Sequence, residues 1–488
     1  MSDPDIPLGL SFDDVLVLPG LSEILPGDAD VSTRLTSKLP LNIPIISSAM
    51  DTVTEAELAI ALAREGGIGV IHRNCPIEEQ VEHVAKVKRS ENAVIQDPQT
   101  VTKDLPMREL EQVMQRHGVS GFPVIDANRM LEGMVTSRDM WNVSDESTTV
   151  AEIMTPRDRL ITGKSSTDLD EALQILSKGR IEKLPLIDED GKLTGLITRQ
   201  DMEKRTMFGN ASKDSQGRLH VGGGIGVGPD WKDRAAALVA AGVDGLFIDA
   251  ATGHTSRVID LIQELKSLYG DKTALVAGNV VTTQGAKDLV AAGTDAVKIG
   301  VGPGSICTTR VISGVGMPQF SAVRAVADYC REHNVVSIAD GGIRYSGDIV
   351  KAIAAGADCV MLGSLLAGTK ESPGAMVNWQ GRRFKEYRGM GSLKAMRKGS
   401  GDRYGQNASG KLVAEGVEAR VPYKGSLSEM VFQLLGGLRS GMGYVGARNL
   451  DELREKAEFV RITAGGLRES HPHDIVITEE PVNYQSPK

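Results

Sequence analysis

One glycine-rich segment contains residue types whose spacing suits covalent chemistry. It reads Gly302-Pro303-Gly304-Ser305-Ile306-Cys307-Thr308-Thr309-Arg310 and directly follows the apolar run 296–301. A buried strand that ends in such a loop can bring backbone amides close to an anion, and here a thiol also lies beside two hydroxyls. The segment therefore indicates nucleophilic attack by Cys307 on a phosphate-bearing substrate. A small buried cysteine in a structural turn is the alternative.

The elements that must position this loop are short apolar strands with helix-like segments between them. The strands that we expect are residues 43–46, 67–71, 221–225, 245–248, 274–277, 296–299, 336–339 and 359–362. Most are separated by amphipathic segments that end in glycine, as helices often do. Eight such strands predict an α/β fold, a (β/α)8 TIM barrel, and a doubly wound parallel sheet is the main competitor.

A barrel predicts where the functional residues are in the sequence, because in this fold they lie just past the carboxyl ends of the strands. Polar or glycine-rich segments do follow the expected strands, at residues 47–51, 249–251, 278–279, 302–310, 340–342 and 363–364. The loops after the seventh and eighth strands often bind a phosphate group. Asp340-Gly341-Gly342 and Gly363-Ser364 occupy these two places, and Ser305 would add a third donor.

A duplication interrupts the alternation after its second strand and helix. Residues 119–140 align without a gap to residues 181–202, which lie 62 positions further on. The two copies resemble a tandem pair of cystathionine-β-synthase (CBS) domains. That resemblance implies binding of adenine or guanine nucleotides, with an aspartate on the ribose hydroxyls. The matching aspartates and the threonines before them are Thr136, Asp139, Thr198 and Asp201. The alternative is that both aspartates only cap helices.

Composition limits the classes of function. The chain has 488 residues, 55 basic against 64 acidic, and a net charge of -9, so we expect no nucleic-acid partner. The four cysteines are scattered without metal-ligand spacing, which favours a reducing compartment over a disulfide framework. No apolar run approaches the ~20 residues that span a bilayer, and the acidic start is unlike a signal peptide. We therefore expect a cytoplasmic protein with no membrane contact.

Longer motifs occur in a fixed order along the chain. They are residues 302–310 with Gly314–Gln319, Ala339–Ile343, Tyr387–Ser392, Gly401–Tyr404 and Glu469–Asp474. Together they resemble the inosine 5'-monophosphate (IMP) dehydrogenase / guanosine 5'-monophosphate (GMP) reductase family, and the resemblance runs from Leu10 to Tyr484. It implies a barrel domain at 1–92 and 206–488 and a CBS pair at 93–205, with repeats at about 93–150 and 151–205. A mobile flap is expected at 393–420, which is rich in glycine, serine and charge.

The activity that this resemblance implies is oxidation of IMP to xanthosine 5'-monophosphate (XMP) with NAD+, in guanine nucleotide biosynthesis. The Cys307 thiolate would attack purine C2, hydride would pass to NAD+, and water would then cleave the thioimidate. Arg403 and Tyr404 match the family's flap dyad, with Arg403 as the activator of water. Because the pKa of an arginine exceeds about 12, a relay of Thr309 and Glu415 remains an alternative.

The resemblance also implies binding residues. For the substrate they are Ser48, Met50, Ser305, Asp340, Gly341, Gly342, Gly363, Ser364, Tyr387, Gly389, Met390, Gly391 and Glu415. For NAD+ they are Asp249, Ala250, Ala251, Asn279, Gly300 and Gly302, although hydroxyl residues or a histidine are common in the family where this chain has Ala250-Ala251-Thr252. A potassium ion would bind Gly302, Gly304 and Cys307 together with Glu469, Ser470 and His471 of a neighbouring subunit.

That shared ion implies a homo-oligomer. The family resemblance implies a homotetramer, which the CBS pairs could join into an octamer, and purine nucleotides such as ATP or GTP as regulators. Two other functions compete. A GMP reductase would share the barrel, the cysteine and the Thr309-Glu415 relay, but it would deaminate GMP with NADPH and would not need the Arg403-Tyr404 flap. The second competing function is that of a nucleotide sensor with an inactive barrel, and the intact Cys307, Thr309 and Arg403 argue against it.

Overall fold

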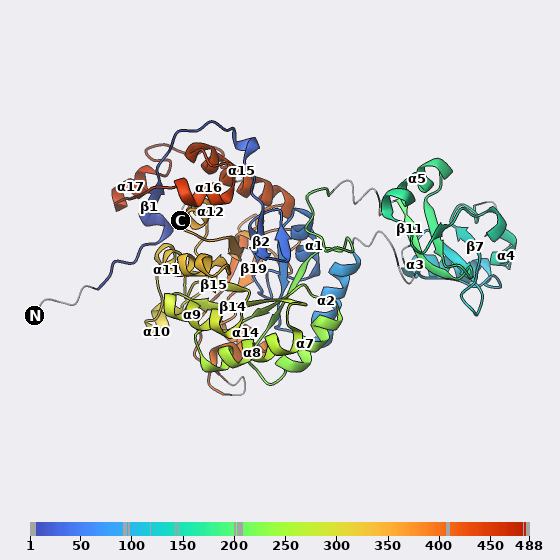
Figure 1. Cartoon of the computed structure of the whole chain (residues 1–488), viewed down its shortest axis with the longest axis horizontal. Coiled ribbons are helices and arrows are strands. Elements are labelled where there is room, and N and C mark those ends of the chain that lie inside the picture. Colours follow the sequence, from blue (N-terminus) through green and yellow to red (C-terminus); the bar gives the residue numbers. More distant parts are fainter. Residues whose placement is uncertain are drawn as a thin grey trace, which may run out of the picture. The chain divides into compact units, whose positions relative to one another are not determined.

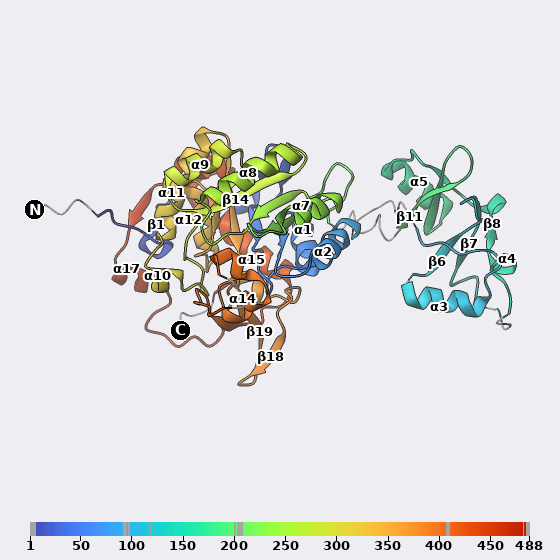
Figure 2. The same cartoon turned by 90° about the horizontal axis from the view of Figure 1, so that it is seen from below.

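The chain forms two compact units in a computed structural model, Met1–Ser90 with Asn210–Lys488 as one and Glu91–Gly209 as the other. The structure describes residues 6–90, 95, 98–117, 119–141, 143, 145, 147–199, 202, 208–406, 410–481, 483 and 484. Figures 1 and 2 show the larger unit as strands surrounded by helices. In the described part of the chain, no helix is both long enough and apolar enough to cross a lipid bilayer.

Eight parallel strands close the barrel of the larger unit. They are β4 (Ile45–Ser47), β5 (Ile68–Ile71), β12 (Val221–Ile225), β13 (Gly245–Ile248), β14 (Ala274–Val280), β15 (Ala296–Ile299), β16 (Val336–Asp340) and β17 (Cys359–Leu362). Their order is β12-β13-β14-β15-β16-β17-β4-β5, so β5 pairs with β12 across the intervening segment. The predicted barrel is confirmed and a doubly wound sheet is excluded. β4 begins later than predicted, since Pro44 has no N–H for the ladder.

Helices cover the outside of the barrel. They are α1 (Ala56–Arg64), α2 (Ile77–Arg89), α7 (Trp231–Ala240), α8 (Ser256–Tyr269), α9 (Thr283–Ala292), α11 (Gln319–Glu332), α12 (Ser346–Ala354) and α15 (Leu427–Val445). The predicted glycine stop is present in α9, where Gly293 has a φ of 104° and its N–H returns to the last turn. Leu238, Leu261 and Leu289 are among the buried side chains by which these helices pack on the barrel. Inside the barrel, Phe247, Ile338 and Met361 belong to a second apolar cluster.

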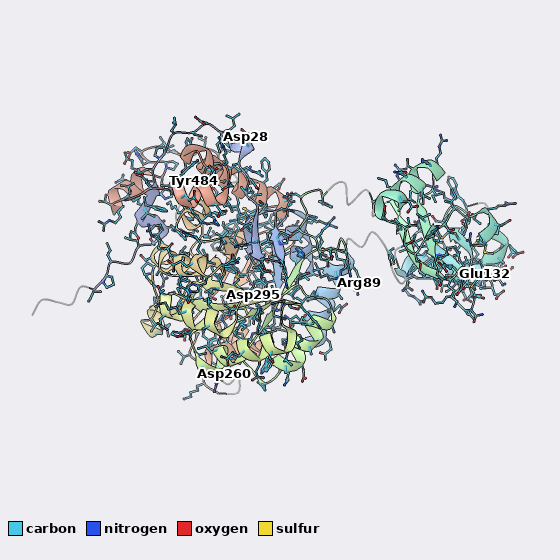
Figure 3. All side chains as sticks on the ribbon, in the orientation of Figure 1. Asp28, Arg89, Glu132, Asp260, Asp295 and Tyr484 are labelled. Atoms are coloured by element: carbon cyan, nitrogen blue, oxygen red, sulfur yellow. The ribbon has the colours of Figure 1, made fainter. Side chains whose placement is uncertain are left out.

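A repeated Ala-Gly-x-Asp sequence ties neighbouring strands together where they begin. Asp244, Asp295 and Asp358 each lie directly before a barrel strand, and each carboxylate accepts the N–H of a residue in the preceding strand at 2.8–2.9 Å. Each also pairs with a cation; Asp295, labelled in Figure 3, lies 2.9 Å from the Lys266 Nζ. These contacts hold the end of the barrel opposite the expected site, where residues serve stability.

Three further strands and two short helices lie between β17 and α15. β18 (Met376–Trp379), β19 (Arg382–Arg388) and β20 (Glu418–Pro422) form an antiparallel sheet, and α13 (Ser364–Ala367) follows β17. The segment between β19 and β20 holds α14 (Leu393–Lys398) and a 3-10 turn at Ser400–Tyr404. The expected flap, 393–420, therefore contains regular structure in its described residues and connects two strands of one sheet.

The smaller unit contains the duplication as two similar sets of elements. A helix and an antiparallel hairpin form each set: α3 (Met107–His117), β6 (Gly121–Ile125) and β7 (Leu131–Thr136), then α5 (Leu169–Gly179), β10 (Lys183–Ile187) and β11 (Leu193–Thr198). The register shifts between Val124 and Ile125 in one hairpin and between Leu186 and Ile187 in the other. These are matching positions of the repeat, so the two copies share even this irregularity.

Candidate active site

A cavity of about 370 Å³ opens past the carboxyl ends of the barrel strands. Its size is ordinary for a small-molecule site. The predicted site residues that line it are Ser48, Met50, Asp249, Asn279, Gly300, Gly302, Gly304, Ser305, Cys307, Asp340, Gly341, Gly342, Gly363, Ser364, Tyr387, Gly389, Met390, Gly391, Arg403, Tyr404 and Glu415. The structure thus brings residues from six strand ends together with residues from the segment between β19 and β20.

The cysteine loop follows β15 and is held from two sides. The Cys307 N–H donates to the Gly304 carbonyl at 3.0 Å, and the Cys307 Sγ lies 3.1 Å from the Thr309 Oγ1. The Thr308 N–H donates to the Glu415 carbonyl at 3.0 Å, so the loop pairs with the segment that carries Glu415. Cys307 is half-buried and faces the cavity, whereas the other three cysteines are buried. Burial raises the pKa of Cys75 to about 11 and that of Cys330 to about 12.

Glycines and hydroxyls gather at the end of the cavity where a phosphate was expected. Gly341 and Gly342 have φ values of 90° and 80°, a region that favours glycine. A Cβ atom on Gly363 would lie only 3.1 Å from the Tyr387 hydroxyl, so a side chain there would crowd the cavity. Burial raises the pKa of Tyr387 to about 12, although Ser305 bonds to it. Tyr387 therefore stays a neutral phenol that can donate to an anion.

Lys298 is a buried cation of this cavity that sequence reasoning missed. Lys298 is 5% exposed and lines the cavity. It lies in β15 between apolar residues, and a lysine within an apolar strand is a feature of the sequence from which a buried charge could have been predicted. Burial lowers the pKa of Lys298, and the charges of Asp340 and Asp249 oppose this effect. Asp340 is also held in place, because the Asn279 Nδ2 donates to its carboxylate at 2.8 Å.

An ion-pair network connects the flap to Asp249. Arg403 pairs with the Asp249 carboxylate, and the Arg73 Nε lies 3.5 Å from that carboxylate. Arg73 also donates two hydrogen bonds to Asp402, at 3.0 and 2.9 Å. Burial raises the pKa of Asp249, but the charges of Arg403, Arg73 and Lys298 outweigh this effect and hold the pKa below its ordinary value.

The same network bears on the chemistry expected of Arg403. Burial lowers the pKa of its guanidinium, but the charge of Asp249 outweighs that effect and holds the pKa above its ordinary value. In this conformation Arg403 is a cation and not a base. Sequence reasoning missed Arg73, which lies two residues past the end of β5. The rule that predicted the other residues past strand ends applies to it equally.

Two of the expected cofactor residues retain free polar atoms. The Asp249 Oδ2 and the Asn279 Oδ1 are buried without a hydrogen-bond partner, and such oxygens fit the hydroxyl donors of a ribose. Ala250 is buried beside Asp249, and the Ala251 N–H donates to the Arg403 carbonyl at 3.2 Å. The two alanines therefore contribute backbone to this region, and they line no part of the cavity among the described residues.

Other expected residues lie elsewhere. Glu469 ends α17 (Ala464–Glu469), the Ser470 hydroxyl donates to the Gly466 carbonyl at 2.8 Å, and the His471 Nδ1 lies 3.0 Å from the Tyr484 hydroxyl. These three residues line no part of the cavity among the described residues, and their predicted role involves a neighbouring subunit.

In the smaller unit, the Asp139 carboxylate accepts the N–H and the hydroxyl of Thr136 at 2.7 and 2.8 Å. The residues that follow, 137–140, form a turn and not a helix, so this contact caps no helix in the described residues. It uses only the Oδ2 oxygen, so Oδ1 is not engaged by Thr136. Thr198 ends β11, and Asp201 lies outside the described residues.

The barrel and its cavity define the class of protein, an enzyme that presents a thiol beside glycine-rich strand ends and a buried carboxylate. Comparison with known proteins then gives the family. The model of the IMP dehydrogenase / GMP reductase domain matches residues 9–473. The chain belongs to this family and is an oxidoreductase.

Individual relatives cover nearly the whole chain. An inosine-5'-monophosphate dehydrogenase of Aquifex aeolicus is 56% identical and the match covers 98% of this chain and 97% of the relative. One from Bacillus subtilis is 52% identical over 98% of both chains. Among solved structures, a GMP reductase of Trypanosoma brucei in complex with guanosine 5'-monophosphate has a TM-score of 0.90 and 42% identity, with 96% of this chain and 99% of that chain covered.

Proposed function

We propose that this protein is an IMP dehydrogenase, which oxidises IMP to XMP with NAD+. The observation that carries the proposal is that Cys307 lines one cavity together with the glycines Gly341, Gly342 and Gly363 and the buried Asp249. A nucleotide whose phosphate lies at Gly341, Gly342 and Gly363 would direct its base toward Cys307 and the segment 389–391. The high identity to relatives that are named IMP dehydrogenases supports the same substrate.

In the first step the Cys307 thiolate adds to purine C2, and the hydrogen at C2 leaves as a hydride. Bound NAD+ supplies the acceptor for that hydride. The residues of this chain prepare the step: Asp340 holds the ribose, Tyr387 and Ser305 donate to the phosphate, and the loop fixes the thiol. The product is a thioimidate, in which C2 remains bonded to the sulfur. This covalent intermediate divides a difficult oxidation into two easier steps.

In the second step water adds to C2, the carbon–sulfur bond breaks, and the thiolate returns as XMP forms. A base must accept a proton from that water. Since Asp249 keeps Arg403 charged in the described conformation, Thr309 and Glu415 serve as the relay here, with Thr309 3.1 Å from the sulfur. Arg403 would then orient the water and stabilise developing negative charge, and could act as the base only after leaving Asp249.

Asp249 has a partner in each step. It would hold the cofactor ribose during hydride transfer, and in the described conformation it pairs with Arg403 of the flap. In this conformation Arg403 and Tyr404 also line the cavity in which the cofactor would lie, so cofactor departure and flap closure become linked. This arrangement admits NAD+ when hydride leaves and closes the site when water must be positioned.

A potassium ion and the smaller unit complete the proposal. Carbonyl oxygens of Gly302, Gly304 and Cys307 are hard donors that suit K+, with Glu469, Ser470 and His471 of a neighbouring subunit in a homotetramer. The smaller unit would act as a CBS pair that binds ATP, GTP or a similar nucleotide and adjusts activity or octamer assembly; the matching hairpins support a common ancestry of its halves. Unchanged nucleotide binding and assembly in Asp139→Ala and Asp201→Ala would contradict this role.

The test of the main proposal is NADH formation, followed by absorbance, when the purified protein meets IMP, NAD+ and potassium. Cys307→Ala should abolish the signal, and Arg403→Ala should leave a first burst of NADH with little further turnover. Replacing potassium by N-methylglucamine should lower the steady rate.

GMP reductase activity is the second candidate, because two solved structures that match this chain are of a GMP reductase. No NADH from IMP, together with consumption of NADPH on addition of GMP, would overturn the dehydrogenase in favour of the reductase. The Arg403-Tyr404 pair favours the dehydrogenase, since a reductase has no water to position on an adduct.

A further inference from the structure

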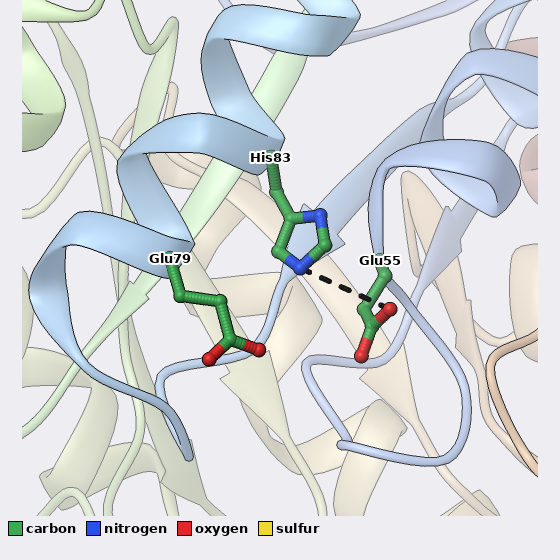
Figure 4. Close-up of side chains that lie close together, drawn as sticks. All are labelled: Glu55, Glu79 and His83. Carbon is green, nitrogen blue, oxygen red and sulfur yellow. Dashed lines mark ion pairs between the residues drawn. The ribbon is translucent and has the colours of Figure 1, made fainter.

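A second cluster of potential ligands lies on the larger unit, outside the cavity of Cys307. It consists of Glu55, Glu79 and His83, whose ligand atoms all lie within 4.8 Å of one another. Figure 4 shows the three side chains converging, with the imidazole of His83 directed at the Glu55 carboxylate. Glu55 comes from the loop after β4, while Glu79 and His83 lie one turn apart on α2 and so share a face of that helix.

The geometry of the cluster leaves one imidazole nitrogen without a hydrogen bond. The His83 Nε2 is buried and makes no hydrogen bond. It lies 3.8 Å from the Glu55 Oε2, too far for a hydrogen bond but close to the separation of two ligands on one small ion. A buried polar nitrogen normally makes a hydrogen bond. The absence of one at the His83 Nε2 therefore points to a ligand between His83 and the carboxylates.

A second histidine fixes the orientation of Glu55. His72 is fully buried, and its Nδ1 accepts the N–H of Asn74 at 3.1 Å. The ring proton therefore lies on Nε2, which is 3.4 Å from the Glu55 Oε1. One oxygen of Glu55 is thus held by His72 while the other faces His83. A carboxylate that ligates a metal is typically hydrogen-bonded in this way by a residue outside the coordination shell.

We propose that Glu55, Glu79 and His83 bind one divalent transition-metal ion of the Zn²⁺ class. One imidazole nitrogen and two carboxylates are a suitable donor set for Zn²⁺, and a water molecule would fill the fourth position. The exposed Glu79 leaves the ion a path from solvent and can move to complete the site. His72 acts as a positioning residue that is not itself a ligand.

This site would have a consequence for the flap. The chain from His72 to Pro76 separates β5 from α2, and it carries Arg73 and Asn74. Arg73 bonds to Asp402, and the Asn74 Nδ2 lies 3.4 Å from the Ala395 carbonyl of α14. An ion that ties α2 to Glu55 would therefore stiffen the segment on which the flap rests.

Zinc binding to untagged full-length protein tests the proposal, measured by isothermal titration calorimetry and by metal analysis after dialysis. Every protein carries Cys307→Ser, so that the thiol of the cavity does not compete for the metal. We expect one Zn²⁺ per chain. His83→Gln and Glu79→Gln should each weaken that binding at least about 100-fold, since loss of a supporting residue alone costs about 10–100-fold.

The matched control is His254→Gln, which removes an exposed histidine paired with Asp288 at 2.6 Å and should bind zinc as the parent does. Glu79 lies on the surface of α2, so Glu79→Gln should fold normally, and far-ultraviolet circular dichroism checks this. Absence of zinc binding, or binding that is unchanged in Glu79→Gln and His83→Gln, would overturn the proposal. A thiolate charge-transfer band in the Co²⁺ spectrum would also overturn it, because the metal would then lie on a cysteine.

Discussion

Arg73→Gln tests whether the flap is held closed by the network around Asp249. Arg73 donates two hydrogen bonds to Asp402 of the flap, and its side chain is 8% exposed against 31% for Asp402. Hydrogen bonds to charged groups contribute about 1.5–3 kcal/mol each, and because Asp402 is partly exposed, the two bonds together are credited with no more than one such bond. We therefore assign about 1.5–3 kcal/mol to the pair, which would lower the ratio of closed to open flap about 10-fold to 100-fold.

The expected kinetic signature separates the two chemical steps. Hydride transfer occurs with the flap open, so Arg73→Gln should keep the first burst of NADH, while hydrolysis and the steady rate fall by about 10-fold or more. Stopped-flow absorbance measures the burst, and mass spectrometry of quenched enzyme measures the adduct on Cys307, which should accumulate. Arg73→Lys should be intermediate because lysine lacks the bidentate geometry.

Two comparisons make this test specific. Asp402→Asn should reproduce the effect, and the double variant should be little worse than either single one, because both remove the same contact. Arg331→Gln, which removes an exposed arginine paired with Asp328, should leave both phases unchanged. An equal fall of burst and steady rate in Arg73→Gln, or no fall at all, would refute the reasoning.

Three further predictions concern other parts of the larger unit. A Cβ atom on Gly391 would lie 2.8 Å from the Tyr404 ring, so Gly391→Ala should slow hydrolysis more than the burst; Gly436→Ala, where nothing lies within 4 Å, is the control. Lys298→Met removes a charge that lowers the pKa of Asp249, so the acid limb of kcat/KM against pH should move to higher pH; an unmoved limb would contradict this. Burial lowers the pKa of His220 below its ordinary 6.5, so the unfolded chain binds an extra proton as pH falls through 6.5. Stability from this group is therefore full above pH 6.5 and lost below it. His220→Asn should reduce the fall in the free energy of unfolding between pH 7.5 and 5.5 by up to about 1 kcal/mol, measured by urea denaturation.

Much of the fold and of the candidate site follows from local sequence. Apolar runs of four or five residues between amphipathic segments predict the eight barrel strands, because burial on both faces requires a nearly continuous apolar strand. Once a barrel is expected, residues directly after each strand are expected at one rim, and Asp249, Cys307 and Asp340 were found in this way. The duplication was equally visible, since its two copies lie in register over 22 residues, 119–140 and 181–202.

Pairings between distant residues were decided only by the closed barrel. Arg73 and Asp402 are 329 positions apart, and no pattern in either segment indicates that they meet. In the sequence, Lys298 is an unexplained charge within an apolar strand. Burial of a lysine without partners would be costly, and the fold supplies the partners by placing Lys298 near the charges of Asp249 and Asp340. Glu55 and His83 approach each other because β4 and β5 are neighbours in the barrel. Sequence determines which residues end each strand, whereas the charges that face one another across the rim depend on closure of the sheet.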